Sequence, residues 1–445
     1  MGYIVGIPCL ILGFLKLYKE KKIDYLSLTW LEWGFVISLS AMKLYGMYSF
    51  SSEVYFLLAM GILFYSFSCF LGIKSRRKVV RIGRRSAYYD NLQEYDLRLW
   101  LLYIFEIVLT IFVIYVSFRT LALLSSGLKM GTIHAMYLNR GNEAFFESTL
   151  LKEIHAKFAV PMLYCNCAIA AFLIVYKRKQ QLLIKIVCVF DLVIWVIMTG
   201  GRFILAYFLL DLMLAFSLGK IQISSRAKKI IKKTIKRLVI LLIVIIIGYT
   251  IFRKGFSSSG NSESTLSLVF EEFYKYFSLS VPLFQHWINE VDLSGTFTFG
   301  MMFFYGILSN INWFLVKLRI GSLAILTTST ALLSEIETMV PIFRDASCNA
   351  FVTCFFYFYS DAGIAGVVLG SSIFGWLSGK IESAAIRYTN NKNVLFYLLF
   401  SQAIIKMFVR FELGNAAYII AFIYLWLLIK RDHSDDAGQD ELSLN

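Results

Sequence analysis

Charged residues and proline are scarce in this chain. Only 16% of its 445 residues are charged and four are proline, whereas 58% are hydrophobic. Soluble domains carry about 25% charged residues, so one soluble core of this length cannot bury so much apolar surface. The seven cysteines are an odd number scattered along the chain, which excludes a disulfide framework. The composition is that of a polytopic membrane protein.

Common catalytic signatures are also missing. The sequence has no Walker loop, no dinucleotide-binding glycine motif, no nucleophile elbow and no internal repeat. Cys165-Asn-Cys167 lacks the second ligand pair of a zinc site and lies in an apolar run, where small side chains pack between helices. We therefore expect no cofactor. The first apolar run has no basic stretch before it and no cleavage site, so we expect it to stay in the membrane.

Apolar runs long enough to cross a bilayer recur along the whole chain. We count about eleven. They lie at 3–18, 25–47, 53–73, 99–119, 158–176, 182–199, 203–219, 236–252, 349–379, 393–411 and 415–430. The shorter segments 298–316 and 321–334 form either a further pair of spans, which would bring the total to about 13, or helices in the membrane interface. The expected fold is one all-α membrane domain over residues 1–445.

Basic residues are concentrated in alternate loops, although the net charge is +15 overall. These loops lie at 16–22, 74–98, 177–179, 220–237 and 380–392, with a further pair at 430–431. Because cytoplasmic loops carry the excess of lysine and arginine, these loops and the tail 431–445 are predicted to be cytoplasmic. The tract 226–237 is interpreted as a surface for anionic lipids, not for nucleic acid. Two large loops, 120–157 and 253–348, are then predicted to face outward.

A glycine-rich turn, Thr199-Gly-Gly-Arg-Phe203, separates two of the predicted spans. Gly200 and Gly201 leave the backbone open to a ligand, and Arg202 carries five donors that suit a diphosphate. The alternative is an arginine that snorkels to the interface at a tight turn.

Three acidic residues lie inside predicted spans. Asp191 and Asp211 are each about ten residues from the glycine turn, so antiparallel packing would put them at the same depth, about 15 Å below the outer surface. Together with Glu106 they indicate either a buried structural network or the proton-binding acids of a transporter.

Polar residues also interrupt the apolar run 349–379. On one continuous helix, Asn349, Thr353, Ser360 and Gly363 would share a stripe about 80° wide. The simpler interpretation is helix packing, with glycines that allow close approach and Asp361 capping a break in the helix.

The pattern Asn-x-Phe-x-Thr followed by Tyr-x-Asp-x-Gly-x-x-Gly, after a long outward loop and an earlier Gly-Gly-Arg turn, resembles the Wzy-type polymerases of bacterial O-antigen and capsule repeat units. One difference is Ala362, where the family often has phenylalanine. The resemblance implies a glycosyltransferase C-type architecture in the bacterial cytoplasmic (inner) membrane. It also implies transfer of a glycan from one undecaprenyl diphosphate to the repeat unit on another. The implied partners are the lipid-linked oligosaccharide, membrane lipids, a chain-length regulator and a flippase, with no nucleic acid.

Such a transfer requires cations for the leaving diphosphate and a base for the acceptor hydroxyl. The candidate cations are Arg202, Arg344, Arg253 and Arg140, and the candidate bases are His286 and His155, followed by Asp345. Further substrate-binding candidates are Gly200, Gly201, Asn349, Thr353, Tyr359 and Asp361. No Asp-x-Asp pair faces outward and Glu335-Ile-Glu337 is interpreted as solvated, so we predict a metal-independent enzyme. The alternatives are an O-antigen ligase, a lipid-linked oligosaccharide flippase or proton-coupled transporter, and a non-catalytic assembly partner.

Overall fold

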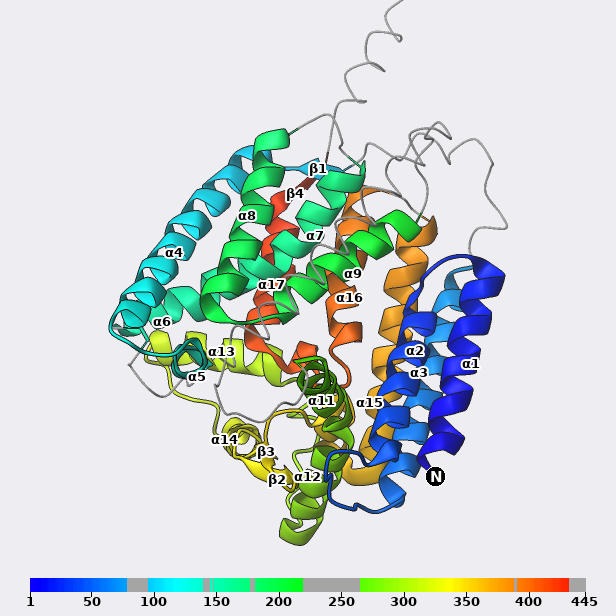
Figure 1. The fold of residues 1–445 in the computed structure, drawn as a ribbon. Helices are drawn as coiled ribbons and strands as arrows, with labels where there is room; N and C mark the ends of the chain where they lie inside the picture. Colours follow the sequence, from blue (N-terminus) through cyan, green and yellow to red (C-terminus); the bar gives the residue numbers. More distant parts are fainter. Residues whose placement is uncertain are drawn as a thin grey trace, which may run out of the picture. The chain divides into compact units, whose positions relative to one another are not determined.

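The computed structural model describes residues 1–77, 95–138, 145–146, 148–176, 181–218, 265–387 and 390–431. These residues are mostly helical and belong to two compact units (Figure 1). Unit 1 comprises Met1–Arg84, Thr265–Arg387 and Phe400–Ile419. Unit 2 comprises Arg85–Ser264, Tyr388–Leu399 and Ile420–Asn445.

Six helical segments among the described residues are long and apolar enough to cross a membrane. They are α1 (Gly2–Glu20), α3 (Glu53–Arg77), α4 (Leu99–Ser125), the continuous stretch Thr149–Tyr176, α8 (Leu182–Thr199) and α15 (Thr353–Arg387). The predicted runs at 25–47, 203–219, 393–411 and 415–430 correspond to helices outside this set of six, namely α2 (Tyr25–Met42), α9 (Phe203–Ser217), α16 (Asn391–Ile405) and α17 (Ala416–Leu428). The structure is thus all-α and rich in membrane-length helices. The run 236–252 lies outside the described residues, and the count of about eleven spans stays a prediction.

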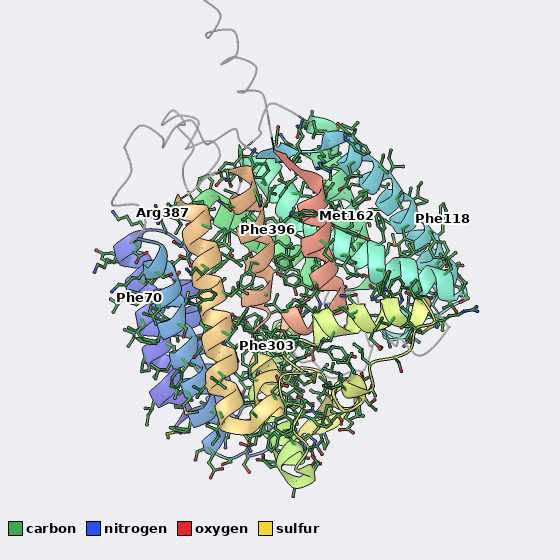
Figure 2. The ribbon with its side chains drawn as sticks, turned by 180° about the vertical axis from the view of Figure 1, so that it is seen from behind. Phe70, Phe118, Met162, Phe303, Arg387 and Phe396 are labelled. Atoms are coloured by element: carbon green, nitrogen blue, oxygen red, sulfur yellow. The ribbon has the colours of Figure 1, made fainter. Side chains whose placement is uncertain are left out.

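Large apolar side chains cover the outer faces of these helices. Phe70 on α3 is 45% exposed and Phe118 on α4 is 69% exposed, whereas Met162 on α7 (Val160–Tyr176) is fully buried (Figure 2). An aromatic ring exposed in the middle of a long apolar helix is stable only against lipid or another apolar surface.

In unit 1, α1 packs on α2 and α3 packs on α15. Two glycines one turn apart on α15 bring it directly against the α3 backbone. A Cβ atom would lie 2.2 Å from the Tyr65 carbonyl oxygen at Gly375, and 2.1 Å from that of Cys69 at Gly379. The prediction that glycines in this run allow close helix approach is confirmed.

Helix α15 is broken within the polar motif. Ala362 has φ −161° and ψ 35°, and Gly363 has φ 59° and ψ −138°, a left-handed φ that glycine tolerates. The helix begins at Thr353, so Asn349 precedes it. The predicted single stripe is therefore wrong, because one of its four members lies outside the helix and another lies at the break.

The segment 265–348 of unit 1 folds into short elements. They are α11 (Thr265–Ser278), α12 (Ser280–Ser294), α13 (Tyr305–Lys317), η5 (Ala324–Leu326), α14 (Thr327–Glu335), β2 (Val340–Phe343) and β3 (Ala346–Cys348). Helices α13 and α14 have 13 and 9 residues, too few for the about 20 that a bilayer requires. Neither helix is among those long and apolar enough to cross a membrane, and whether 298–334 adds spans stays a prediction. β2 pairs antiparallel with β3, with Val340 opposite Cys348.

In unit 2, α8 packs on α4, and α7 packs on both α8 and α9. Two hydrogen bonds, Thr110 to Asp191 and Thr120 to the Met198 carbonyl, advance along both helices in the same direction. Helices α4 and α8 are therefore parallel, as the predicted alternation of spans requires. β1 (Tyr95–Leu97) pairs with β4 (Ile429–Arg431), which puts the basic ends of α4 and α17 on the same side.

Candidate functional site: a glycine–arginine turn and a broken helix

The Gly-Gly-Arg turn of unit 2 ends α8 and begins α9. Gly200 has φ 81° and caps α8 through its N–H, which donates to the Val196 carbonyl at 2.9 Å. The Gly201 N–H donates to the Thr199 hydroxyl at 3.4 Å. Arg202 follows at the N-cap of α9 and is half-buried. The turn thus presents a permanent cation beside an open backbone.

Side chains from two other helices hold the end of α8 in place. The Thr120 hydroxyl of α4 donates to the Met198 carbonyl at 3.1 Å. His134 of α5 (Met130–Leu138) has its Nδ1 2.6 Å from the Thr199 carbonyl, so this nitrogen carries the hydrogen. Sequence reasoning missed the role of His134, because no spacing rule connects it to a carbonyl 65 residues away.

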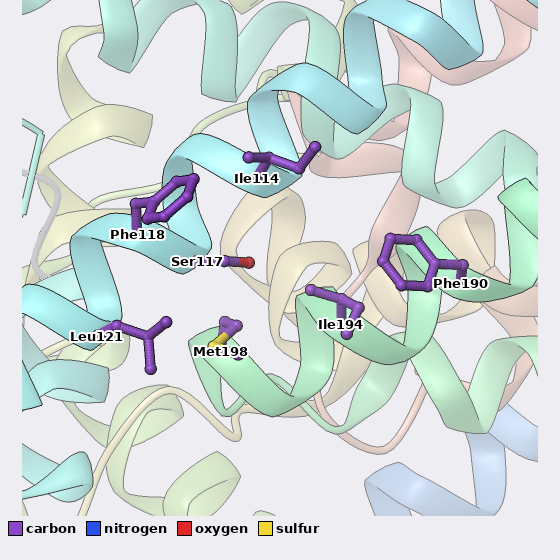
Figure 3. A pocket seen from close by; sticks show the side chains of 7 residues that line it. All are labelled: Ile114, Ser117, Phe118, Leu121, Phe190, Ile194 and Met198. Atoms are coloured by element: carbon purple, nitrogen blue, oxygen red, sulfur yellow. The ribbon is translucent and has the colours of Figure 1, made fainter.

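A shallow apolar hollow lies between α4 and α8 (Figure 3). It is lined by Ile114, Ser117, Phe118 and Leu121 of α4, and by Phe190, Ile194 and Met198 of α8. Most of its walls are exposed, and Met198 precedes Arg202 by four residues. The cationic turn therefore follows, one helical turn along the chain, on a partly exposed apolar hollow.

His155 lies in an aromatic cluster of unit 2. It begins the π-turn η4 (His155–Ala159), which joins α6 (Thr149–Ile154) to α7 in one membrane-length stretch. Its Nε2 lies 2.8 Å from the Tyr137 hydroxyl, and its ring stacks on Trp195 with centroids 5.8 Å apart. His155 lies near the N-terminal end of this stretch, and both its ring face and its Nε2 contact protein.

The other two base candidates belong to unit 1. His286 is half-buried on α12, with its ring 5.0 Å from that of Trp287. Asp345 lies in the turn between β2 and β3, where its carboxylate is 62% exposed and 2.8 Å from the Lys275 Nζ. Burial lowers the pKa of Lys275, but hydrogen bonds to Asp345 and Glu271 outweigh it, so the net pKa lies above the ordinary value.

Arg344 shares this turn and is exposed, with its N–H donating to the Gly46 carbonyl at 3.0 Å. Arg140 and Arg253 lie outside the described residues.

The segment that leads into α15 is strained and tightly held. Ala350 and Thr353 both have φ 69°, which is an outlier for a β-branched threonine. The Thr353 N–H donates to the Val409 carbonyl at 3.0 Å, and Asn349 donates to the Glu337 carbonyl at 2.6 Å. The Thr353 hydroxyl is buried and has no hydrogen-bond partner among the described residues.

Arg410 binds both this segment and Glu337. Its Nε donates to the Ala350 carbonyl at 3.0 Å, and its Nη2 lies 2.7 Å from the Glu337 carboxylate. Glu335 and Glu337 are both exposed, as the interpretation of Glu335-Ile-Glu337 as solvated expects, and Glu337 is in addition the ion-pair partner of Arg410. Sequence reasoning placed Arg410 at the end of a span, but α16 ends at Ile405.

Asp361 and Tyr359 connect the broken helix to the segment 292–303. The Asp361 carboxylate accepts from the Thr298 hydroxyl at 2.5 Å and from the backbone N–H groups of Met302 and Phe303 at 2.9 Å each. The Tyr359 hydroxyl donates to the Asp292 carboxylate at 2.8 Å. Asp361 thus lies next to a helix break, as expected, but it caps the turn that precedes α13.

The intramembrane acids are arranged differently from the expected Asp191–Asp211 pair. Asp191 accepts from Thr110 of α4 at 2.7 Å, whereas Asp211 lies on α9, near Cys167 of α7. Glu106 of α4 accepts from Asn166 of α7 at 3.1 Å and from the Cys188 thiol of α8 at 3.4 Å. The structure therefore brings Asp191 to the helix that carries Glu106.

Comparison of the chain with protein-family models, curated proteins and solved structures gives no match.

Proposed function

We propose that this protein polymerises lipid-linked oligosaccharide repeat units, moving a glycan from one undecaprenyl diphosphate carrier to the sugar on another at the outer face of the bacterial cytoplasmic membrane. The observation that carries the proposal is the Gly200–Arg202 turn at the end of the apolar hollow between α4 and α8. A polyprenyl diphosphate has a wholly apolar chain joined to a strongly anionic head. A partly exposed apolar hollow followed by an arginine fits both parts.

The transfer forms one bond and breaks another. The acceptor hydroxyl attacks the anomeric carbon, the bond from that carbon to the diphosphate oxygen breaks, and the hydroxyl proton passes to a base. Negative charge builds on the leaving diphosphate, and the Arg202 guanidinium stabilises it through two parallel hydrogen bonds. Arg344 is the other candidate arginine among the described residues; it is exposed in unit 1, and its contact with an anionic substrate is a separate proposal.

Among the base candidates we favour His286. Histidine titrates near neutral pH, and this side chain is half-buried on α12, outside the membrane-length helices. His155 is the weaker candidate because Tyr137 already occupies its Nε2. Asp345 is weaker too, because its carboxylate is paired with Lys275.

The strained segment 349–353 is proposed to contact the glycan. Backbone outliers of the kind found at Ala350 and Thr353 persist where the surrounding structure holds them, and such outliers cluster at functional sites. Asn349 is half-buried and supplies an amide suited to a sugar, whereas Thr353 is fully buried and is assigned the positioning of this segment. Tyr359 and Asp361 have their polar atoms engaged within the protein, so we assign them the positioning of this segment and of the break.

The test is a reaction with purified protein. With repeat units on undecaprenyl diphosphate as the only substrate, and a chelator but no nucleotide sugar or gradient, we expect longer lipid-linked glycans and free undecaprenyl diphosphate. A ligase would form the new bond only when lipid A core is supplied, and a transporter would form none. Failure of well-folded protein to extend its native repeat unit, or a strict requirement for divalent metal, would reject the mechanism.

Substitutions at Arg202 test the proposed diphosphate contact. Arg202→Lys keeps the charge but loses the paired donors, so we expect polymer yield to fall about tenfold or more at unchanged protein level. Arg98→Lys is the matched control. Arg98 lies at the N-terminal end of α4, whereas the hollow is next to the C-terminal half of this helix, so the yield should be unchanged. Full polymer from Arg202→Ala would show that this arginine only anchors the turn.

A further inference from the structure

Two hydrogen bonds join α4 to α8 around a pair of buried acids. Glu106 and Thr110 lie one turn apart on α4, and Cys188 and Asp191 lie nearly one turn apart on α8. The Cys188 thiol donates to the Glu106 carboxyl, and the Thr110 hydroxyl donates to the Asp191 carboxyl. The two carboxyl groups therefore lie about one helical turn apart in depth, roughly 6 Å.

Both acids are cut off from water and from positive charge. Asp191 is fully buried and Glu106 is 2% exposed. Their hydrogen-bond donors are an amide, a thiol and a hydroxyl, all neutral, and neither carboxyl is paired with a lysine or arginine of the described residues. Two ionised carboxylates at this spacing, in helices of membrane length, repel each other and lack solvation.

The network also leaves polar oxygens without donors. The second oxygen of Asp191 and the side-chain oxygen of Asn166 are buried and have no hydrogen-bond partner among the described residues. Asn166 is fully buried and directs its amide group at Glu106, so this orphan oxygen belongs to the same cluster. A proton on one of the two acids would remove one of the two charges and with it the repulsion between them. We propose that Glu106 and Asp191 form a buried proton-binding site in unit 2, a property independent of glycan polymerisation.

The donor arrangement favours a proton over a sodium ion. A metal cation needs oxygen atoms converging on one point, but Asn166 and Cys188 turn hydrogens toward the two oxygens of Glu106. Those hydrogens would repel a cation at this carboxyl. Asp191 has only one side-chain oxygen without a hydrogen-bond partner, which is too few ligands for a sodium ion. Sodium binding is the alternative that the experiment tests.

Other ionisable side chains are distributed along the packed helices of unit 2, and of these Cys165 lies near Glu106. Lys185 lies six residues before Asp191 on α8, about 9 Å along the axis, and interacts with other groups. Arg119, at the far end of α4, donates to the Phe145 carbonyl. Apart from Cys188, the remaining groups on α4, η4, α7, α8 and α9 are Tyr103, Tyr115, His155, Lys157, Tyr164, Cys165, Cys167, Tyr176, Tyr207 and Asp211, and α17 adds Tyr424.

Dicyclohexylcarbodiimide tests the proposal, because it adds to protonated carboxyl groups in apolar surroundings and leaves a stable N-acylurea that peptide mass spectrometry locates. The full-length protein in lipid nanodiscs should carry the adduct on Glu106 or Asp191 at pH 7, and labelling should fall as the pH is raised. Asp191→Asn removes the neighbouring charge, so the midpoint for Glu106 labelling should shift to lower pH by about one unit or more. A purely structural network would not change this midpoint.

Asp211→Asn is the matched control, since it removes another buried acid of unit 2 that lies near Cys167. It should leave the midpoint for Glu106 unchanged. Absence of adduct on both acids in folded wild-type protein would overturn the proposal, as would a midpoint that Asp191→Asn does not shift. Protection by sodium chloride relative to choline chloride at equal ionic strength would show a cation site instead. The wild-type experiment decides even where a variant fails to fold.

Discussion

Asp361→Asn should loosen the connection between the broken helix α15 and the turn before α13. The Asp361 carboxylate accepts three hydrogen bonds. Two of the donors are the backbone N–H groups of Met302 and Phe303. Asparagine keeps the shape of the side chain, but it loses the charge and turns an NH₂ group toward one of these donors. Hydrogen bonds to a charged group contribute about 1.5–3 kcal/mol each. Because the amide oxygen still accepts in part, we expect a net loss of about 2–4 kcal/mol.

Hydrogen exchange measures this loss locally. If the turn opens independently, a cost of about 2–4 kcal/mol lowers the protection of peptides covering 298–304 by about 30- to 700-fold. Asp292→Asn is the matched control, because this carboxylate is exposed and holds only the Tyr359 hydroxyl, so its loss should cost about 1 kcal/mol or less.

Unchanged exchange at 302–303 in Asp361→Asn would refute the reasoning, as would equal effects from the two variants. Either result would mean that packing around the break, and not the carboxylate, holds this turn.

Three further predictions follow from the packing and the charges. Gly379→Leu should force α3 and α15 apart and cost about 3 kcal/mol in thermal unfolding, whereas Leu369→Ala on the exposed face of α15 should cost less than about 0.5 kcal/mol. Lys275→Met should lower stability by about 0.5–1 kcal/mol at low salt. Because the folded-state pKa of Lys275 is raised, this contribution is complete below about pH 10.4 and is lost as the pH rises through the folded-state value, so the difference should be constant between about pH 6 and 9. In a background without reactive thiols, Ser126→Cys should react with an impermeant reagent in intact spheroplasts and Ser75→Cys only after lysis; the reverse pattern would invert the predicted orientation.

The helices were predictable because apolar length and local periodicity specify them. The close approach of α15 to α3 was also predictable, since glycines in an apolar helix have few other uses. The C-terminal limit of the helix in the run 393–411 could not be predicted from the sequence. α16 stops at Ile405, because the carbonyls of Met407 and Val409 accept from the N–H groups of Cys354 and Thr353. A window of hydropathy contains no information about a partner some 50 residues away.

The candidate site shows the same division between local and distant information. The Gly-Gly-Arg turn was recognisable because glycine tolerates the left-handed φ that ends α8. Its supports, Thr120 and His134, were not recognisable, because each acts on a backbone carbonyl, an acceptor that every residue has. The partners of Asp361 were hidden for the same reason, since two of its three donors are backbone N–H groups about 60 residues away.

The buried acids of the two units differ in how their charge is satisfied, and this difference separates a structural role from a binding role. Asp361 accepts three hydrogen bonds, so both of its carboxylate oxygens have protein donors. Asp191 has one donor, an empty second oxygen and another acid about one turn away. An arrangement of that kind is stable only when something positive is added, because the protein supplies neither enough donors nor a cation among the described residues. We therefore expect Asp361 variants to change the order of a turn, and Asp191 variants to change the midpoint of Glu106 labelling.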